Sequence, residues 1–149
     1  MSEEHKRIAL KFLTAMSEGD SSAQAECLAD DATTVTHGFA QVSGTRNRDT
    51  MLATVAAFNE IVPTGFRPTF HKVVAEGDTV FVEWEGNAVL SNGTPYCNQY
   101  VFIFTFADGR IRRIDEYFCT VLADTTILPL LAEKSAEMAH GNPTDVAPN

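Results

Sequence analysis

The sequence is poor in cysteine, in basic residues and in long hydrophobic runs, and each shortage excludes a class of protein. The 3 cysteines are scattered and form no C-x-x-C pair, which is typical of reduced thiols in a cytoplasmic protein rather than a disulfide framework or zinc site. There are 11 Lys and Arg against 20 Asp and Glu, for a net charge of −9. That balance argues against nucleic acid and anionic membranes as partners. No apolar run is long enough to span a bilayer, and we expect no secretory signal in the charged first residues.

What remains is an ordinary soluble composition. With 149 residues, 44% hydrophobic and 21% charged, the chain suits one domain with a sizeable core. We assign that domain to residues 1–135 and expect the polar, Pro-containing residues 136–149 to be a frayed tail. The His and acidic residues show no metal-ligand spacing, and neither a Ser-His-Asp arrangement nor a glycine-rich phosphate loop is present. We therefore expect no metal and no cofactor.

The first third of the chain is predicted to be helical. Apolar residues recur at helical spacing from Ile8 and predict a helix that ends at Gly19. A second, short helix is predicted to start near Ser21, with Gln24 as its capping-box partner. A third is predicted over about residues 48–60, with Asn47 as its cap.

Strands follow. Turn signals at residues 76–78, at Asn92-Gly93 and at Asp108-Gly109 divide residues 67–119 into four segments. Such short connections make neighbouring strands antiparallel. Residues 32–37, rich in Thr and Val, are also predicted to be extended. The predicted fold is α+β: a cone-shaped, curved antiparallel sheet packed against three N-terminal helices.

The stretch from Tyr96 to Cys119 is the most informative part of the chain. Alternation places Asn98, Tyr100 and Phe102 on one face of the first strand, among further aromatic residues. On the second strand Glu116 shares a face with Ile114 and Phe118. An aromatic wall with a few polar groups is typical of a small-molecule pocket.

The preceding strand adds a wall to this pocket. Val80, Val82 and Trp84 share one side; the other side, with Phe81, Glu83, Glu85 and Asn87, is half acidic. Closed by the helices, the concave face would have an apolar lining that includes Trp84, Phe102 and Phe118. The alternative is a fully packed core without a cavity.

Several segments carry a resemblance to one superfamily. They are Leu28-Ala29-Asp30-Asp31-Ala32-Thr33, Ser43-Gly44-Thr45, Tyr96-x-Asn98-x-Tyr100, Asp108-Gly109-Arg110-Ile111 and Asp115-Glu116-Tyr117-Phe118. Over about residues 5–122 the chain resembles the nuclear transport factor 2-like (cystatin-like) fold, in its ketosteroid-isomerase-like and SnoaL-like polyketide-cyclase branch. The resemblance implies the fold more than the chemistry, because this superfamily hosts isomerases, cyclases, dehydratases, epoxide hydrolases and non-catalytic binders.

The resemblance also implies which chemistry is missing. The catalytic tyrosine, aspartate base and protonated aspartic acid of ketosteroid isomerase correspond to Phe12, Thr36 and about Phe102 here. Steroid isomerisation by that mechanism is therefore not expected, and Phe12 becomes a candidate pocket residue. The chain is also similar in places to limonene-epoxide hydrolase, whose catalytic arginine corresponds to Trp84. Of that enzyme's carboxylates, one corresponds to Glu116.

Glu116 is the leading catalytic candidate. Its apolar neighbours should raise its pKa, which suits a general acid or base. Asn98 and Tyr100 are candidate anchors for a ligand carbonyl or hydroxyl. His37, which follows the strand that carries a base in relatives, is a candidate proton-transfer partner. The structural alternatives are a carboxyl satisfied by Asn98, Tyr100 or an arginine such as Arg112, and a histidine at a rim or turn.

The sequence leaves two functions open. The first is a cofactor-independent acid–base enzyme acting on a small hydrophobic molecule that bears a carbonyl or hydroxyl. Isomerisation, cyclisation, dehydration and epoxide opening are the reaction types compatible with this hypothesis. The second is a binding or interaction module of the same fold. In either case we expect a homodimer formed through the outer face of the sheet, which carries Phe81, Val101, Ile103 and Tyr117.

Overall fold

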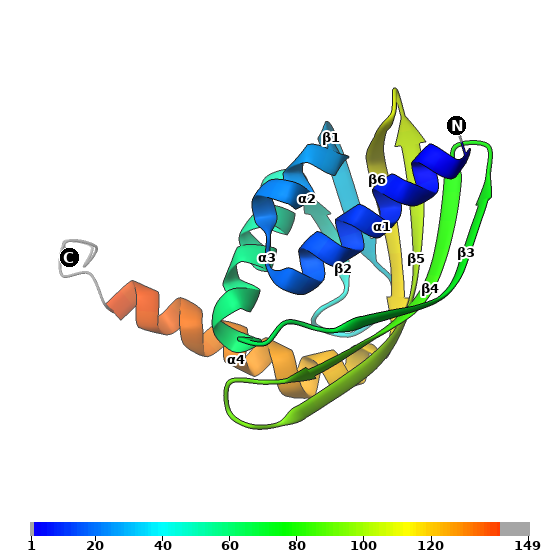
Figure 1. Cartoon of the computed structure of the whole chain (residues 1–149). Coiled ribbons are helices and arrows are strands. Elements are labelled where there is room, and N and C mark those ends of the chain that lie inside the picture. The colour runs from blue at the N-terminus through cyan, green and yellow to red at the C-terminus, as the bar shows by residue number, and fades with distance from the viewer. Residues whose placement is uncertain (1, 141–149) are drawn as a thin grey trace, which may run out of the picture.

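A curved sheet and a layer of helices form the molecule (Figure 1). The computed structural model describes residues 2–140, with side chains described as far as residue 134. Within these residues the elements are α1 (Ser2–Glu18), α2 (Ser21–Cys27), β1 (Leu28–Thr36), β2 (Gly44–Asn47), α3 (Arg48–Ile61), β3 (Pro68–Glu76), β4 (Thr79–Val89), β5 (Pro95–Ala107), β6 (Arg110–Phe118) and α4 (Thr120–His140).

The first three helices confirm the sequence prediction, with one correction at a cap. α1 ends before Gly19, whose φ of +71° suits glycine. Asn47 caps α3, because its side chain accepts a hydrogen bond from the backbone N–H of Thr50 at 2.9 Å. The predicted capping box of α2 is wrong. Asp20 is the N-cap and accepts from the N–H of Ala23 at 3.0 Å.

The sheet has six strands in the order β2-β1-β6-β5-β4-β3. The predicted antiparallel run of β3, β4, β5 and β6 is confirmed. At the β5–β6 turn Asp108 and Gly109 both have positive φ, +51° and +77°, as the tightest hairpin turns require. The prediction of a wholly antiparallel sheet is corrected, because β1 pairs with β6 in parallel. The fold is therefore α+β, with a mixed curved sheet.

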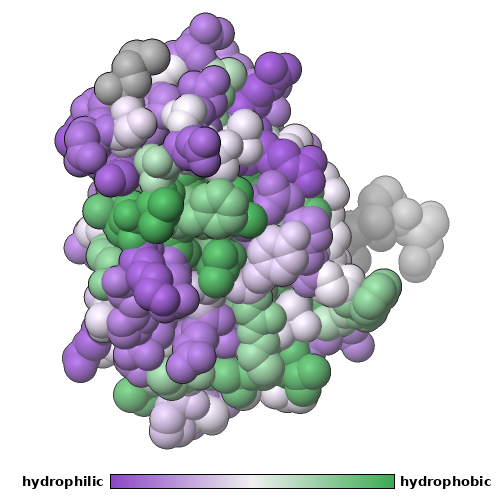
Figure 2. Space-filling view, turned by 90° about the vertical axis from the view of Figure 1, so that its right-hand side faces the viewer, coloured by the Kyte–Doolittle hydropathy of each residue, from purple (hydrophilic) through white to green (hydrophobic). Residues whose placement is uncertain are grey.

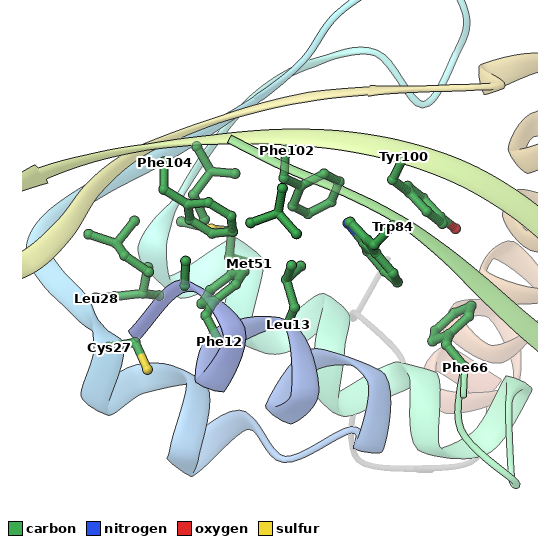
Figure 3. Packing of buried hydrophobic residues seen from close by; sticks show 14 of the residues in the cluster. Phe12, Leu13, Cys27, Leu28, Met51, Phe66, Trp84, Tyr100, Phe102 and Phe104 are labelled. Carbon is green, nitrogen blue, oxygen red and sulfur yellow. The ribbon is translucent and has the colours of Figure 1, made fainter. Parts of the chain in front are cut away.

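Apolar packing joins the helices to the concave face of the sheet (Figure 3). Phe12 of α1 meets Phe104 of β5 edge to face, with ring centroids 5.6 Å apart. Trp84 of β4 is stacked on Tyr100 of β5, at 4.2 Å. Burial of such aromatic side chains contributes on the order of 2–3 kcal/mol each.

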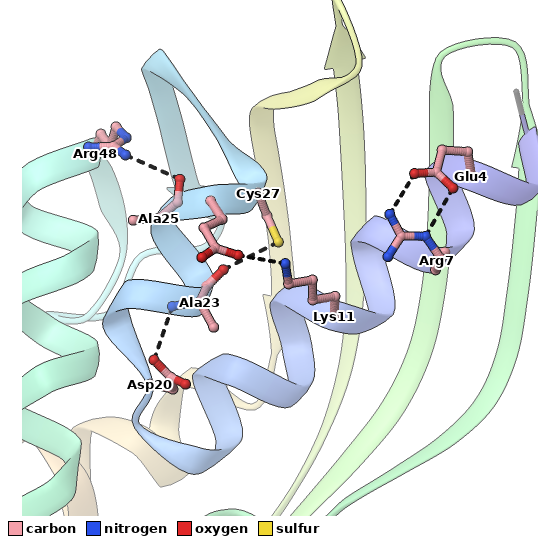
Figure 4. Close-up of polar contacts among 9 residues, drawn as sticks. Glu4, Arg7, Lys11, Asp20, Ala23, Ala25, Cys27 and Arg48 are labelled. Carbon is pink, nitrogen blue, oxygen red and sulfur yellow. Dashed lines mark hydrogen bonds and ion pairs between the residues drawn. The ribbon is translucent and has the colours of Figure 1, made fainter.

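Polar contacts align the helices with one another (Figure 4). Lys11 of α1 pairs with Glu26 of α2 at 2.7 Å, and Arg48 of α3 donates to the backbone oxygen of Ala25 at 3.2 Å. The Lys11–Glu26 pair is exposed, and exposed pairs contribute about 0–1 kcal/mol. The core therefore supplies most of the stability, and these contacts fix orientation.

A fourth helix, α4, was not predicted. It follows β6 after one residue and includes Pro129 in its interior. Apolar and polar residues are spread around the helix axis in its sequence rather than gathered on one side, so the helical period is weak. The frayed tail was expected from residue 136, whereas α4 continues to His140; residues 141–149 lie outside the described part of the chain.

The outer face of the sheet carries exposed apolar side chains. Val74, Phe81 and Tyr117 are each close to half exposed or more. Figure 2 views the molecule from the side where β3 lies in Figure 1, and it shows a hydrophobic patch surrounded by hydrophilic residues. Among the described residues, no helix is both long enough and apolar enough to cross a membrane.

Candidate active site

A cavity of about 320 Å³ lies between the sheet and the helices. Its walls are mainly aromatic and aliphatic. The predicted wall residues Phe12, Trp84, Phe102 and Phe118 all line it, together with Phe58 and Phe66. Its polar walls include Thr34, Thr36, Arg46, Tyr96, Tyr100 and Glu116.

Glu116 enters this cavity because of its position in β6. Its strand neighbours are Phe102 of β5 on one side and Thr36 of β1 on the other. Thr34 donates a hydrogen bond to Oε1 at 3.0 Å, and Thr36 donates one to Oε2 at 2.8 Å. The predicted partners Asn98, Tyr100 and Arg112 do not bond the carboxylate; two threonine hydroxyls do.

The electrostatics of Glu116 follow from this setting. Burial raises the pKa of Glu116 above its ordinary value, as the sequence predicted. The hydrogen bonds from Thr36 and Thr34 and the positive charge of Arg46 act in the opposite direction. Among the described residues that line the cavity, Glu116 is the only carboxylic acid. A carboxylic acid whose pKa is raised holds its proton more tightly than an exposed glutamate, which suits a general acid or base.

Arg46 is a cavity residue that the sequence analysis missed. It lies in β2 opposite Thr34. Its guanidinium donates to Thr36 Oγ1 at 3.2 Å and to the backbone oxygen of Val42 at 2.5 Å. The nearby Ser43-Gly44-Thr45 segment was recognised, but only the pairing of β2 with β1 turns Arg46 toward Glu116, and that pairing leaves no local signal.

Tyr100 lines the cavity as predicted, whereas Asn98 does not. The Tyr100 and Tyr96 hydroxyls lie 2.9 Å apart, and burial raises the pKa of both phenols, that of Tyr100 strongly. Asn98 is 3% exposed, and its amide group makes hydrogen bonds within the protein. Nδ2 donates to the Tyr96 hydroxyl and to the Cys119 backbone oxygen, and Oδ1 accepts from the Cys119 N–H. Asn98 therefore holds the phenol pair and the start of α4 in place.

His37 lies outside the cavity lining, against the expectation that it joins Glu116. Its Nε2 lies 2.8 Å from Asp115 Oδ1, and its ring stacks on Tyr117 with centroids 4.4 Å apart. Both partners have the opposite strand parity to Glu116. The link between His37 and Glu116 is made by the backbone alone, where the His37 N–H donates to the Glu116 carbonyl at 3.0 Å.

Helix α4 supplies another wall of the cavity. Ala123, Ile127, Leu128 and Leu131 line it. Asp124, on the same helix, accepts hydrogen bonds from the backbone N–H groups of Gln41 and Val42, both at 2.8 Å. Asp124 therefore fastens α4 to the loop between β1 and β2.

Comparison with known proteins places this architecture in a family. The sequence model of the SnoaL-like domain matches residues 9–114, so the chain belongs to the SnoaL-like domain family. A comparison with curated protein sequences finds no match.

Solved structures share the fold. An NTF2-like protein from Burkholderia xenovorans LB400 has 21% identity and a TM-score of 0.66 over 85% of this chain and 97% of that one. An LEH-like epoxide hydrolase from M. tuberculosis has 18% identity and a TM-score of 0.65 over 95% and 98%. A protein with a ketosteroid isomerase-like fold from Catenulispora acidiphila DSM 44928, solved with trimethylamine, has 20% identity and a TM-score of 0.65 over 78% and 90%. At these identities the likeness establishes a common fold.

Proposed function

We propose that the cavity is the active site of a cofactor-independent acid–base enzyme of the isomerase, cyclase, dehydratase or epoxide hydrolase type. The observation that carries the proposal is Glu116, a carboxylic acid that burial makes a weaker acid, on the wall of a mainly apolar cavity. General acid–base catalysis by a placed side chain is typically worth about 10²- to 10⁴-fold. The family supports this class of chemistry, because the resemblance described above includes such enzymes.

The cavity walls define the substrate class that we propose. A volume of about 320 Å³ lies at the lower end of ligand sites, which favours a small molecule. Phe102, Phe118 and Trp84 would pack on an apolar skeleton. A carbonyl or hydroxyl would lie beside Glu116 or the Tyr100 hydroxyl. Asn98 supports Tyr96 from behind, instead of meeting the ligand as the sequence suggested, and His37 lies too far toward the outer face to share the proton.

The alternative is a non-catalytic module that binds small molecules in the same cavity. It is favoured by the residues at the positions where ketosteroid isomerase, by resemblance, has its catalytic groups. Those positions hold Phe12, Thr36 and Phe102, and none of these side chains titrates. A cavity with bound ligand but without proton transfer would fit this alternative.

We also propose that the protein is a cytoplasmic homodimer formed through the outer face of the sheet. Val74, Phe81 and Tyr117 are 59%, 45% and 47% exposed, and contiguous apolar surface of this kind favours a partner. In this proposal the inner face of the sheet binds the ligand, and the outer face forms the dimer interface.

Proton transfer can be tested without knowing the natural substrate. The purified protein is incubated in D₂O with a panel of small ketones, enones, terpenoid alcohols and epoxides. Mass spectrometry and NMR then detect deuterium incorporation, rearrangement or ring opening, and parallel thermal-shift assays detect binding. The proposal predicts turnover of at least one panel class by the parent and its loss in Glu116→Gln. Binding by both proteins without turnover by either would favour the binding module.

A further inference from the structure

The cavity holds one positive charge as well as one negative charge. Among the described lining residues, the ionisable groups are Glu116 of β6, Arg46 of β2, and Tyr96 and Tyr100 of β5. The lining residues from the helices are apolar or uncharged. Among the described lining residues, Arg46 is therefore the only cation that faces Glu116, and its two side-chain hydrogen bonds go to uncharged acceptors.

The hydroxyl of Thr36 connects the two charges. It accepts a hydrogen bond from Arg46 at 3.2 Å and donates one to Glu116 Oε2 at 2.8 Å. Thr36 is 3% exposed, so water competes little for either bond. A hydroxyl has one proton to donate. Because the guanidinium of Arg46 donates to a lone pair of the Thr36 oxygen, the Thr36 proton is directed to the Glu116 carboxylate.

A second set of hydrogen bonds connects Arg46 to α4. The guanidinium also donates to the backbone oxygen of Val42, and the backbone N–H of Val42 donates to Asp124. Asp124 additionally accepts from the N–H of Gln41. A continuous series of contacts thus runs from α4, which covers one side of the cavity, to the carboxylate inside it.

We propose that Arg46 is the positioning residue of this site: it orients Thr36 against Glu116, and Asp124 fixes Arg46 through the loop when α4 covers the cavity. This inference rests on the proposed function of Glu116 and assigns a second residue to the same site. Arg46 favours the ionised carboxylate, and thereby prepares Glu116 to act first as a base. Burial and Arg46 act against each other at this carboxylate, which keeps it able to both accept and release a proton.

The proposal is tested on Glu116 itself, without a substrate. The protein is labelled with ¹³C at glutamate side chains, and the carboxyl signal of Glu116, assigned by its loss in Glu116→Gln, is followed against pH. Arg46→Met should tighten proton binding at Glu116 by about 3- to 10-fold, because an opposing charge is removed. Arg46→Lys, which keeps the charge but loses the two-pronged contact, should have a smaller effect.

Arg48→Met is the matched control. Arg48 lies two positions further along the chain and bonds the backbone of Ala25 instead of a cavity residue. Its removal should leave the titration of Glu116 unchanged. If Arg46→Met has no more effect on Glu116 than Arg48→Met, the role of Arg46 is wrong.

Thr36→Val tests whether the effect passes through the hydroxyl. It keeps the shape of the side chain and leaves Arg46 in place. In the Thr36→Val background, Arg46→Met should change proton binding at Glu116 less than it does in the parent. Equal effects in both backgrounds would contradict orientation through Thr36.

Asp124→Ala tests the link to α4, with Thr125→Ala as control. Thr125 is the next residue on the helix, and its hydroxyl bonds carbonyls of α4 itself. Asp124→Ala should shift the titration of Glu116 in the same direction as Arg46→Met, but by less. An unchanged titration in Asp124→Ala would refute the link. All these measurements are independent of turnover. The role of Arg46 can therefore be refuted while the proposed function of Glu116 holds, and the proposed function can be refuted while the role of Arg46 holds.

Discussion

Asp115 and Glu116 are neighbours in β6, yet the strand places them on opposite faces of the sheet. Two hydrogen bonds from Arg113, at 2.8 and 3.0 Å, hold the pKa of Asp115 below its ordinary value, and His37 adds to this. Burial raises the pKa of Glu116 instead. One carboxyl group is a stronger acid than usual on the outer face, and the other is a weaker acid than usual in the cavity.

The difference shows how little sequence distance matters to the role of a side chain in a strand. Successive side chains of a strand point to opposite faces of the sheet, so Glu116 faces the cavity and Asp115 faces outward. The same alternation places Tyr117 on the outer face, where it stacks on His37, the partner of Asp115. Thr36 and Phe118 lie on the inner face and line the cavity with Glu116. In the function that we propose, the inner residues provide the chemistry and the outer residues form a structural cluster.

The largest contrast between the two carboxylates should be in turnover. Glu116→Gln keeps the volume of the side chain but removes its proton, and should lower the rate by about 10²- to 10⁴-fold. Asp115→Asn should keep most of the activity, since Asp115 lies outside the cavity lining. Rates are measured on any substrate found with the panel above. Loss of activity in Asp115→Asn, with Glu116→Gln active, would reverse the assignment.

A second contrast compares a phenylalanine of the cavity wall with one on the surface. Phe102 is 2% exposed, and Phe39, in the loop between β1 and β2, is fully exposed. Phe102→Ala should lower the free energy of unfolding by about 3–5 kcal/mol. Phe39→Ala should change it by no more than about 0.5 kcal/mol. Urea denaturation measures both, and equal values would mean that the cavity wall is not part of the cooperative core.

The outer face can be tested by its assembly. Sedimentation equilibrium at micromolar concentration should give a dimer, and Phe81→Glu should weaken it by at least about tenfold. Phe39→Glu introduces the same charge on the loop and should leave the dimer intact. A single species of 16.3 kDa for the parent would refute assembly through this face.

The smallest effect expected is on the pH dependence of stability, where the two carboxylates should act with opposite sign. The pKa of Glu116 is raised by folding, so its contribution is full below the ordinary value of 4.5 and is lost as the pH rises through the folded pKa. The pKa of Asp115 is lowered, so its contribution is present above 3.8 and is lost as the pH falls through the folded pKa.

Unfolding free energies from pH 2 to 8 test this. The advantage of the parent over Glu116→Gln should shrink as the pH rises from below 4.5, whereas its advantage over Asp115→Asn should shrink as the pH falls below 3.8. Slopes of the same sign would mean that the two carboxyl groups share one environment.

The sequence predicted what local rules determine. Alternation along β5 and β6 placed Glu116, Tyr100 and Phe102 on one face, and Asp108-Gly109 marked the turn between the strands. Three features of the site escaped prediction, two because they depend on long-range strand pairing and the third, a helix, because its helical period is weak in the sequence. They are the parallel contact of β1 with β6, the position of Arg46 opposite Thr34, and the covering helix α4.

Asn98 and His37 show that local rules can place a residue near the site without predicting the contacts of its side chain. Parity placed Asn98 on the pocket face correctly, but the backbone of Cys119, at the start of a helix that was not foreseen, takes up its amide. His37 was placed near Glu116 by resemblance, and it does lie beside the strand that carries Glu116. Its ring turns to Asp115 because the outer face offers a carboxylate and an aromatic surface there.

The most direct test of the central claim is a carboxyl ¹³C NMR titration of Asp115 and Glu116 in one sample. The signals are assigned with Asp115→Asn and Glu116→Gln. We predict that Glu116 titrates above its ordinary value of 4.5 and Asp115 below its ordinary value of 3.8. A Glu116 that titrates at or below 4.5 would contradict the claim that this carboxylate is set apart in the cavity for proton transfer.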